Sequence, residues 1–348
     1  MNQIIFFHPQ NDFSGSTRVL AQVIETEYSG LPVKVVTMSR SNGFLSLLSN
    51  VKIIPIKLLL YKGKSIPGLT QIVWRLHAFM LALRYGKQCD TFYINTILPF
   101  YAAIAGRLCG KRLVYHVHEK FVRYTWGMRI AEYIFLHTEA KRIFVSHYVK
   151  QQYPLLNHKN SVVKYNLLPL SFLSAVEVVP VELRKRKVVL MMCSLSKAKG
   201  VYTFMEVAKQ RPQYSFRLLL SSSKGEIINF FGYELPYNVE LIPAQSNVHP
   251  YLHSADLILN LSIPSLWIET FGMTIIEAMA YGIPAIVPNV GGPTEIVENG
   301  HNGYCIDVSD VDAVVKAIDR VLSKEEYQRM AENSLEKIKE FIYNVSSG

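Results

Sequence analysis

The sequence lacks the patterns that mark several common classes of protein. Its four cysteines are widely spaced and form no C-x-x-C pair, which argues against a zinc or redox site and favours a reducing cytoplasm. No cationic head precedes the short apolar run at the start, so we expect no signal peptide. The longest apolar stretch, residues 92–105, contains Asn95 and Pro99 and is shorter than the roughly 20 residues of a membrane-spanning helix. No G-x-G-x-x-G follows a predicted strand, which argues against a dinucleotide-dependent oxidoreductase.

The excess of positive charge is confined to the first half of the chain. Residues 1–180 hold 21 Lys and Arg against 8 Asp and Glu, whereas residues 181–348 hold 16 against 19. This asymmetry predicts that the first half meets an anionic partner, such as a membrane surface or a phosphorylated lipid. Nucleic acid is disfavoured as a partner, because the cations form no dense run and the aromatic residues follow core spacing.

Both halves alternate β-rich runs with amphipathic helical stretches, which predicts βαβ units and mainly parallel sheets. We therefore expect an α/β protein with two Rossmann-like, doubly wound domains, residues 1–180 and 181–348, facing a cleft where a ligand binds. The boundary is placed in the segment 167–187, which carries two prolines and a basic cluster. The last helix, about residues 324–342, either packs on the second domain or crosses back to the first.

The expected elements follow from these runs. The predicted strands are residues 4–7, 33–37, 91–94, 113–117, 188–192, 216–220, 239–242, 256–260 and 284–288, and the predicted helices of the first half are residues 16–28, 69–85, 99–108 and 126–137.

The segment 262–284 carries the most informative pattern. A buried strand leads into a loop and then into a short helix that begins near Met273. Thr274, Glu277 and Tyr281 lie on one stripe of this otherwise apolar helix. A lone carboxylate there must face water or meet hydrogen-bond donors, such as the hydroxyls of a ribose, because its unpaired burial is costly. A stripe that simply faces solvent is the alternative.

Glu269 lies in the loop before this helix, in the spacing E-x7-E with Glu277. The N–H groups of Phe271, Gly272 and Met273 open the helix, and such helix starts attract anions. The two carboxylates are therefore expected to flank a phosphate-bearing ligand.

Three motifs follow one another here: E-x7-E enclosing Phe271 and Gly272, then Glu-Ala-Met-Ala-x-Gly-x-Pro from Glu277, then Gly-Gly-Pro-Thr-Glu at 291–295. Together they resemble the donor-binding region of the retaining GT-B glycosyltransferases of family 4 (glycosyl transferases group 1), of the type that builds bacterial surface polysaccharides. The resemblance implies a metal-independent, cofactor-free hexosyltransferase that moves a sugar from a UDP- or GDP-sugar to a glycan or lipid-linked acceptor, as in capsule or lipopolysaccharide biosynthesis. It leaves the base, the sugar, the linkage and the oligomeric state open.

The loop 193–200 joins a predicted strand to a helix. Lys197 and Lys199 oppose the dipole of that helix unless they share an anion, which a diphosphate would supply; two solvated lysines are the alternative. In the family this loop carries Gly-Arg followed a few residues later by Lys-Gly. Lys199 and Gly200 match, but Ser194 stands at the Arg position, so phosphate binding there is open and Lys197 is the candidate replacement.

Two places in the first half are further candidates. Gly15 lies in a phosphate-tolerant turn, for which a plain helix cap by Ser14 or Ser16 is the alternative. In the family, a His followed by an acid at a strand end contacts the donor sugar, which makes His118 a catalytic candidate, with a structural histidine as the alternative. His116 shares the strand face of His118, but no third metal ligand is evident.

Asp310 and Asp312 spell D-x-D, the metal–nucleotide motif of another glycosyltransferase fold, but helix capping explains them and we predict no metal site. The resemblance implies front-side attack without a protein nucleophile. In that scheme Lys199 holds the diphosphate, Glu269 the hydroxyls of the donor sugar and Glu277 the ribose.

Residues 44–64 mix large apolar side chains with four lysines, a composition suited to an anionic leaflet; a core strand is the alternative. We expect a cytoplasmic enzyme, and as a further expectation one bound peripherally to the inner face of the plasma membrane. Two other functions stay open, a nucleotide-sugar epimerase of the same fold and a non-catalytic nucleotide-sugar-binding protein.

Overall fold

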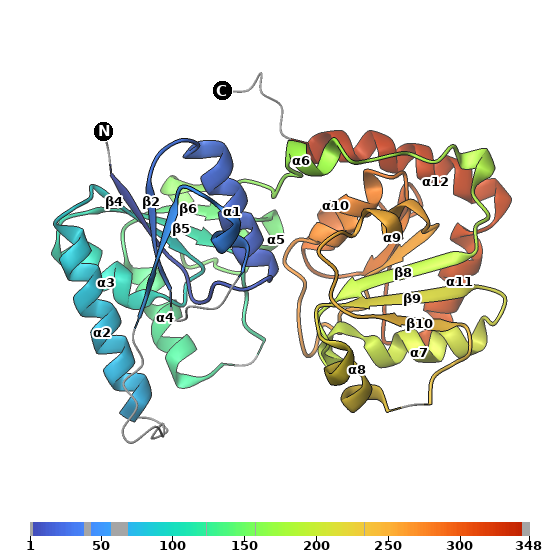
Figure 1. Ribbon diagram of the computed structural model, residues 1–348, viewed down its shortest axis with the longest axis horizontal. Coiled ribbons are helices and arrows are strands. Elements are labelled where there is room, and N and C mark those ends of the chain that lie inside the picture. The colour runs from blue at the N-terminus through green and yellow to red at the C-terminus, as the bar shows by residue number, and fades with distance from the viewer. Residues whose placement is uncertain are drawn as a thin grey trace. The chain divides into compact units, whose positions relative to one another are not determined.

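The computed structural model describes residues 3–37, 43–56, 69–122, 124–156, 158–232 and 234–342. The chain divides into an N-terminal unit, Met1–Lys164, and a C-terminal unit, Tyr165–Gly348. Each unit is a parallel sheet flanked by helices (Figure 1), so the predicted α/β architecture is confirmed. The domain boundary expected at residue 180 lies further along the chain than this division and stays a prediction.

The N-terminal sheet has seven strands in the order β3-β2-β1-β4-β5-β6-β7. Its strands are β1 (Ile4–Phe7), β2 (Val33–Thr37), β3 (Val51–Pro55), β4 (Thr91–Asn95), β5 (Arg112–Val117), β6 (Lys141–Phe144) and β7 (Ser161–Val163), and its helices are α1 (Gly15–Glu27), α2 (Leu69–Gly86), α3 (Phe100–Leu108), α4 (Trp126–His137) and α5 (His147–Gln151), with 3-10 turns η1 (Phe44–Leu47) and η2 (His158–Asn160). The four predicted strands and four predicted helices are present. β7 was missed because it is a short edge strand without full burial.

The C-terminal sheet has six strands in the order β10-β9-β8-β11-β12-β13. Its strands are β8 (Val188–Cys193), β9 (Ser215–Leu220), β10 (Val239–Ile242), β11 (Leu257–Leu259), β12 (Ala285–Pro288) and β13 (Gly303–Ile306). The helices are α6 (Leu170–Leu173), α7 (Val201–Gln210), α8 (Lys224–Phe231), α9 (His249–His253), α10 (Met273–Met279), α11 (Val311–Val321) and α12 (Lys324–Lys337), with 3-10 turns η3 (Val181–Leu183), η4 (Lys197–Lys199), η5 (Gly292–Glu295) and η6 (Ile338–Phe341). Every strand predicted for this half is present.

Strand order reverses direction at one place in each sheet. In the N-terminal unit, β1 pairs with both β2 and β4, and in the C-terminal unit β8 pairs with both β9 and β11. In doubly wound sheets, ligands bind outside the carboxyl ends of the strands at this switch point. The loops that follow β1, β4, β8 and β11 are therefore where a site is expected.

Helix caps account for two acidic patterns of the C-terminal unit. Asp310 caps α11, since its side chain accepts a hydrogen bond from the backbone N of Ala313 at 3.0 Å. The D-x-D pair is thus a capping feature, as predicted. Ser323 likewise accepts from the backbone N of Glu326 and opens α12, which packs against α10 and α11.

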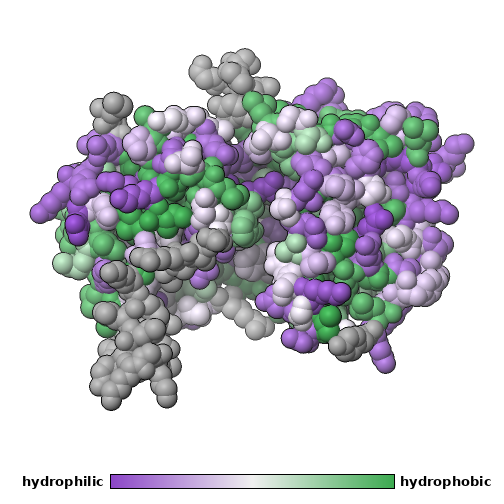
Figure 2. All heavy atoms as spheres, in the orientation of Figure 1, coloured by the Kyte–Doolittle hydropathy of each residue, from purple (hydrophilic) through white to green (hydrophobic). Residues whose placement is uncertain are grey.

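Hydrophilic side chains cover much of the surface where α11 and α12 lie (Figure 2).

The segment 44–64 is only partly described. It contains η1 and then β3, which runs parallel to β2 at the edge of the sheet, so the alternative of a strand holds for residues 51–55. Residues 57–64, with three of its four lysines, lie outside the described residues. No helix in the described part of the chain is long and apolar enough to cross a membrane.

Gly200 permits the turn from β8 into α7. Its φ of +73° lies in the left-handed region, and an added Cβ would lie 2.0 Å from the carbonyl oxygen of Leu261. Gly225, in α8, has no atom within 4 Å of the same position. Gly200 is therefore a sterically constrained position, and Gly225 is an open position that serves as its control.

We expect Gly200→Ala to lower the free energy of unfolding by about 2 kcal/mol or more, because left-handed backbone strain adds to a steric clash. Gly225→Ala should leave it unchanged or raise it by up to about 1 kcal/mol. Urea denaturation followed by circular dichroism measures both. Equal effects of the two substitutions would show that the close approach at Gly200 has no energetic weight.

Candidate active site

Three loops gather at the carboxyl edge of the C-terminal sheet, following β8, β11 and β12. The backbone N of Ile263 donates to the carbonyl oxygen of Ala198 at 2.9 Å, which ties the second loop to the first. The backbone N of Gly292 donates to the carbonyl oxygen of Glu269, also at 2.9 Å, which ties the third loop to the second. The predicted motif residues of this half are thus held on one framework.

Lys199 and Glu269 form an ion pair in which Nζ and Oε2 are 2.7 Å apart. Their side chains keep 17% and 21% of their exposure, so the pair stays in contact with solvent. The Lys199 ammonium also lies 4.9 Å from the ring centroid of Trp267, a cation–π distance. Sequence reasoning chose both charged residues but did not foresee the pair, and it missed Trp267, whose half-exposed ring had no motif to mark it.

Lys197 and Ser194 have different surroundings. The Lys197 ammonium lies 5.6 Å from the ring centroid of Tyr202, on α7. Ser194 is exposed at the end of β8. Whether Lys197 replaces the arginine that the family carries at the Ser194 position stays a prediction.

Glu277 is buried on α10, with 1% of its surface exposed. The alternative of a solvent-facing stripe is therefore wrong for this residue. Tyr281, further along the stripe, is also buried, and its hydroxyl lies 2.5 Å from Nδ1 of His249. Glu277 and Tyr281 thus face inward, while Thr274 is partly exposed, and a buried carboxylate needs hydrogen-bond donors.

The start of α10 is formed as predicted at Met273. Gly272 precedes it with a φ of +127°, a conformation that favours glycine. The Phe271 ring is buried beside the rings of Tyr165 and Phe341, with centroids 5.9 and 5.8 Å away. Phe271 therefore anchors the loop in the core, and its backbone is the part that could meet a ligand.

In the N-terminal unit, a chain of hydrogen bonds runs across the carboxyl ends of β5, β4 and β1. His118 Nε2 lies 2.8 Å from Asn95 Oδ1, and Asn95 Nδ2 lies 2.9 Å from His8 Nδ1. His8 Nε2 lies 2.9 Å from the Thr17 hydroxyl, which donates to Asp12 Oδ1 at 2.7 Å. Sequence reasoning found His118 but missed the other four members. His8 and Asp12 follow β1, Asn95 ends β4, and Thr17 lies in the first turn of α1.

The amide of Asn95 fixes the proton positions along this chain. Its Nδ2 also donates to the carbonyl oxygen of Ser16 at 3.1 Å, which orients the amide. Because an amide oxygen only accepts, His118 must carry its proton on Nε2. Because an amide nitrogen only donates, His8 accepts at Nδ1 and donates from Nε2 to Thr17. Both rings therefore carry a proton on Nε2, and His8, which accepts at Nδ1, is neutral.

Burial is the largest cause of the pKa shifts of the ionisable groups near this chain of hydrogen bonds. It lowers the pKa of His8 to about 4 and that of His116 to about 3. Burial also lowers the pKa of His118, with further lowering from the charges that His116 and His8 would carry. For Glu119, burial raises the pKa to about 7, against hydrogen bonds such as that from the backbone N of Ile97.

The turn at Gly15 is organised by Asp12. Gly15 is the first residue of α1, and an added Cβ there would meet no atom within 4 Å. Asp12 Oδ1 accepts from the backbone N of Ser14 at 3.0 Å and from its hydroxyl at 2.6 Å. Ser14 occupies the cap position without a capping hydrogen bond of its own, so the alternative of capping by Ser14 is wrong in detail.

His116 and His118 lie on one face of the strand, as expected, with ring centroids 4.3 Å apart. His116 Nδ1 lies 2.9 Å from the Tyr93 hydroxyl, and His118 pairs with Asn95. Throughout the residues with described positions, no three His, Cys, Asp or Glu side chains gather as metal ligands.

Comparisons with known proteins bear on the same loops. Residues 178–337 match the sequence model of the family described as glycosyl transferases group 1. This segment is similar to that family. Over 99 residues the chain is 37% identical to N-acetyl-alpha-D-glucosaminyl L-malate synthase of Bacillus anthracis, covering 28% of this chain and 24% of that protein. Over 120 residues it is 29% identical to an Escherichia coli protein, UDP-Gal:alpha-D-GlcNAc-diphosphoundecaprenol alpha-1,3-galactosyltransferase, covering 33% and 30%.

The similarity in structure extends over both units. The Anabaena protein HepE, solved in complex with UDP and glucose, superposes with a TM-score of 0.78 over 98% of this chain and 96% of its own, at 20% identity. The lipopolysaccharide outer core galactosyltransferase WaaB, in its apo form, gives a TM-score of 0.71 at 18% identity, covering 98% and 96%. The fold is therefore the GT-B fold. The matched sequence segments span only about a quarter to a third of the curated relatives.

The buried, neutral His116 generates a pH dependence of stability. Its pKa is about 3 in the folded chain and near 6.5 when unfolded, so between these values the unfolded chain binds a proton that the folded chain does not. The stabilisation is complete above pH 6.5 and is lost as the pH falls. From pH 6.5 to 5 we expect a loss of about 2 kcal/mol from this residue.

His116→Gln removes this titration while keeping a hydrogen-bond acceptor for Tyr93. The difference in unfolding free energy between wild type and His116→Gln should therefore fall by about 2 kcal/mol between pH 6.5 and 5. The exposed His301 supplies the control, since His301→Gln should parallel wild type at each pH. A wild-type minus His116→Gln difference that is constant with pH contradicts a neutral buried His116.

Proposed function

We propose that this protein is a retaining glycosyltransferase of the hexosyltransferase type, which moves a sugar from a nucleotide diphosphate to a hydroxyl of an acceptor. The Lys199–Glu269 ion pair carries the proposal, because it lies beside a switch point of a doubly wound sheet and within the segment similar to group 1 glycosyl transferases. The buried carboxylate of Glu277 supports it as a group that would accept hydrogen bonds from ribose hydroxyls.

Lys199 has the position and charge to act on the leaving group. As the bond from the anomeric carbon to the diphosphate breaks, negative charge grows on the phosphate oxygens, and a fixed cation stabilises this charge. The ion pair with Glu269 limits the conformations of the lysine before the donor arrives. Glu269 would in turn accept hydrogen bonds from the hydroxyls of the donor sugar.

The reaction needs no nucleophile from the protein. The acceptor hydroxyl attacks the anomeric carbon from the side that the diphosphate leaves, and the departing phosphate oxygen takes the hydroxyl proton. His118, whose pKa is lowered by burial and which donates to Asn95, is proposed to contact the donor sugar near the reacting carbon. We propose that neither a metal ion nor a cofactor takes part.

UDP-sugars are the first donors to test. The superposed Anabaena protein was solved with UDP and glucose, and the name of the Escherichia coli relative specifies UDP-Gal. GDP-sugars are the second choice. The acceptor is proposed to be a lipid-linked glycan of a capsule or lipopolysaccharide, met at the cytoplasmic face of the membrane, and the positive charge of residues 1–180 supports an anionic setting.

The experiment incubates the protein with UDP-glucose, UDP-galactose, UDP-N-acetylglucosamine and their GDP counterparts, with and without lipid-linked acceptors. We expect the nucleotide diphosphate to be released only when an acceptor is present. The new glycosidic bond should have the α configuration. Conversion of the donor sugar without transfer would instead identify an epimerase. Binding of donor without turnover would identify a non-catalytic binding protein.

Substitutions test the assigned residues. Lys199→Ala and Glu277→Ala should each lower kcat/KM at least ~10-fold, about 1.4 kcal/mol of transition-state stabilisation. The matched control is Lys209→Ala, on the solvent face of α7, where the lysine pairs with Glu206 and both side chains are more than half exposed. Wild-type kcat/KM in Lys199→Ala, or an equal loss in Lys209→Ala, contradicts the assignment.

A further inference from the structure

A hollow of about 910 Å³ lies at the amino edge of the N-terminal sheet, where β1, β4, β5, β6 and β7 begin. The register places these starts side by side, since Thr91 pairs with Arg112 and Val114 pairs with Lys141. The site residues His8, Asn95 and His118 lie at the opposite, carboxyl edge. Strands of five or six residues separate the two edges by roughly 16–20 Å.

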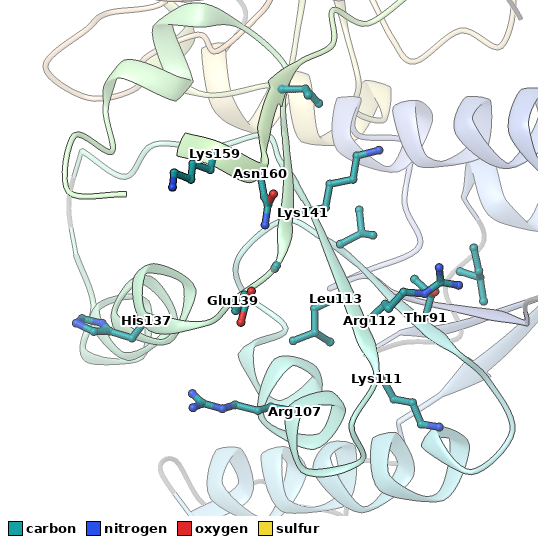
Figure 3. Close-up of a pocket in the computed structure, with 14 residues that line it drawn as sticks. Thr91, Arg107, Lys111, Arg112, Leu113, His137, Glu139, Lys141, Lys159 and Asn160 are labelled. Atoms are coloured by element: carbon teal, nitrogen blue, oxygen red, sulfur yellow. The ribbon is translucent and has the colours of Figure 1, made fainter. Parts of the chain in front are cut away.

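The lining of this basic hollow is strongly cationic. Its charged members are Arg107, Lys111, Arg112, Lys141 and Lys159, with His137 and a lone carboxylate, Glu139. Figure 3 shows Lys159 and Asn160 on one side of Glu139 and Arg107 on the other, with Lys111 and Arg112 beyond Leu113. This concentration accounts for part of the charge excess of the first half of the chain.

Two of these groups have a role without any ligand. Arg107 lies in the last turn of α3 and His137 in the last turn of α4, where a cation offsets the helix dipole. Arg112 and Lys141 lie instead at strand starts, and Lys111 lies between the end of α3 and β5, beyond the last helical turn. Their placement around one hollow needs another explanation.

The three side chains also differ from other cations of the described residues in their ion pairing. Within the part of the chain that the structure describes, Lys111, Arg112 and Lys141 take part in no ion pair. By contrast, Lys120 pairs with Glu132 and Lys164 pairs with Glu27 in the same unit. Like charges around one hollow repel each other, and an anion of several charges would remove that repulsion.

Glu139 does not neutralise the hollow, and its surroundings are fixed. Burial lowers the pKa of Arg142, a sequence neighbour in β6, and the charge of Glu139 acts against that lowering. Arg142 is buried and donates to the carbonyl oxygens of Phe135 and Ala140, each at 3.3 Å, which ties the end of α4 to β6. The wall of the hollow is therefore anchored in the core rather than carried on a loose loop.

We propose that the basic hollow is a second binding site, which takes an anion bearing two or more phosphate groups. Ammonium and guanidinium groups offer donors without acceptors, and guanidinium matches the geometry of phosphate oxygens. The anion is either a free phosphorylated molecule or the headgroup of an acidic lipid, which share this chemistry. Because it lies at the opposite sheet edge, this site is separate from the proposed donor site and does not depend on the proposed function.

The test compares the full chain with two triple variants of equal charge change. The hollow variant carries Lys111→Gln, Arg112→Gln and Lys141→Gln. The control variant carries Lys185→Gln, Lys316→Gln and Lys324→Gln, which alter exposed lysines of the C-terminal unit. Titration calorimetry with inositol hexakisphosphate probes a free anion, and cosedimentation with phosphatidylglycerol or phosphatidylcholine vesicles probes a headgroup.

We expect the hollow variant to lose at least ~10-fold in affinity for inositol hexakisphosphate, or its cosedimentation with phosphatidylglycerol, while the control variant keeps both. Loss in the first assay identifies a free anion as the ligand source, and loss in the second identifies a lipid headgroup. The melting temperature of the hollow variant should not fall, because its substitutions remove repulsion between like charges. Binding that persists in the hollow variant, falls equally in both variants, or is absent from wild type overturns the proposal.

Discussion

Parallel strand pairing is the constraint on which the rest of this structure depends. Because all strands of a sheet run the same way, every loop after a strand emerges at one edge, and every return from a helix arrives at the other. The reversal of strand order at β1 and β8 opens the carboxyl edge to polar groups. The Lys199–Glu269 pair and the chain from Asp12 to His118 both lie at such places.

The two units use their carboxyl edges differently. The C-terminal unit presents charge that stays in contact with solvent, in a lysine and a glutamate that pair across two loops. The N-terminal unit presents two imidazoles, those of His8 and His118, whose pKa values burial lowers and whose Nε2 protons are fixed by one amide. A cation suits a diphosphate, whereas neutral donors and acceptors suit the hydroxyls of a sugar. This division fits the proposed reaction, in which negative charge grows on the leaving diphosphate.

The two edges of the N-terminal sheet also differ in kind. Its carboxyl edge satisfies its polar groups internally, from Asp12 through His8 to His118. Its amino edge leaves Lys111, Arg112 and Lys141 around a hollow with a single carboxylate. Internal satisfaction fixes a geometry, while uncompensated charge attracts a partner. The two ligands proposed for this sheet therefore lie at opposite edges.

Sequence by itself determined the alternation of strands and helices, the cap at Asp310, and the motif that singled out Glu269 and Glu277. These features depend on neighbours within about eight residues, where periodicity, capping and loop chemistry act. The edge strand β7 was not predicted from the sequence, since a short, partly exposed run has no distinctive pattern.

Only the tertiary structure decided which distant groups meet. Lys199 and Glu269 are 70 residues apart, and Asn95 joins His8 and His118 from separate strands. The basic hollow likewise draws its lysines from different strand starts. Such contacts follow from strand order and register, which arise from the packing of the whole sheet and leave no local trace in the chain.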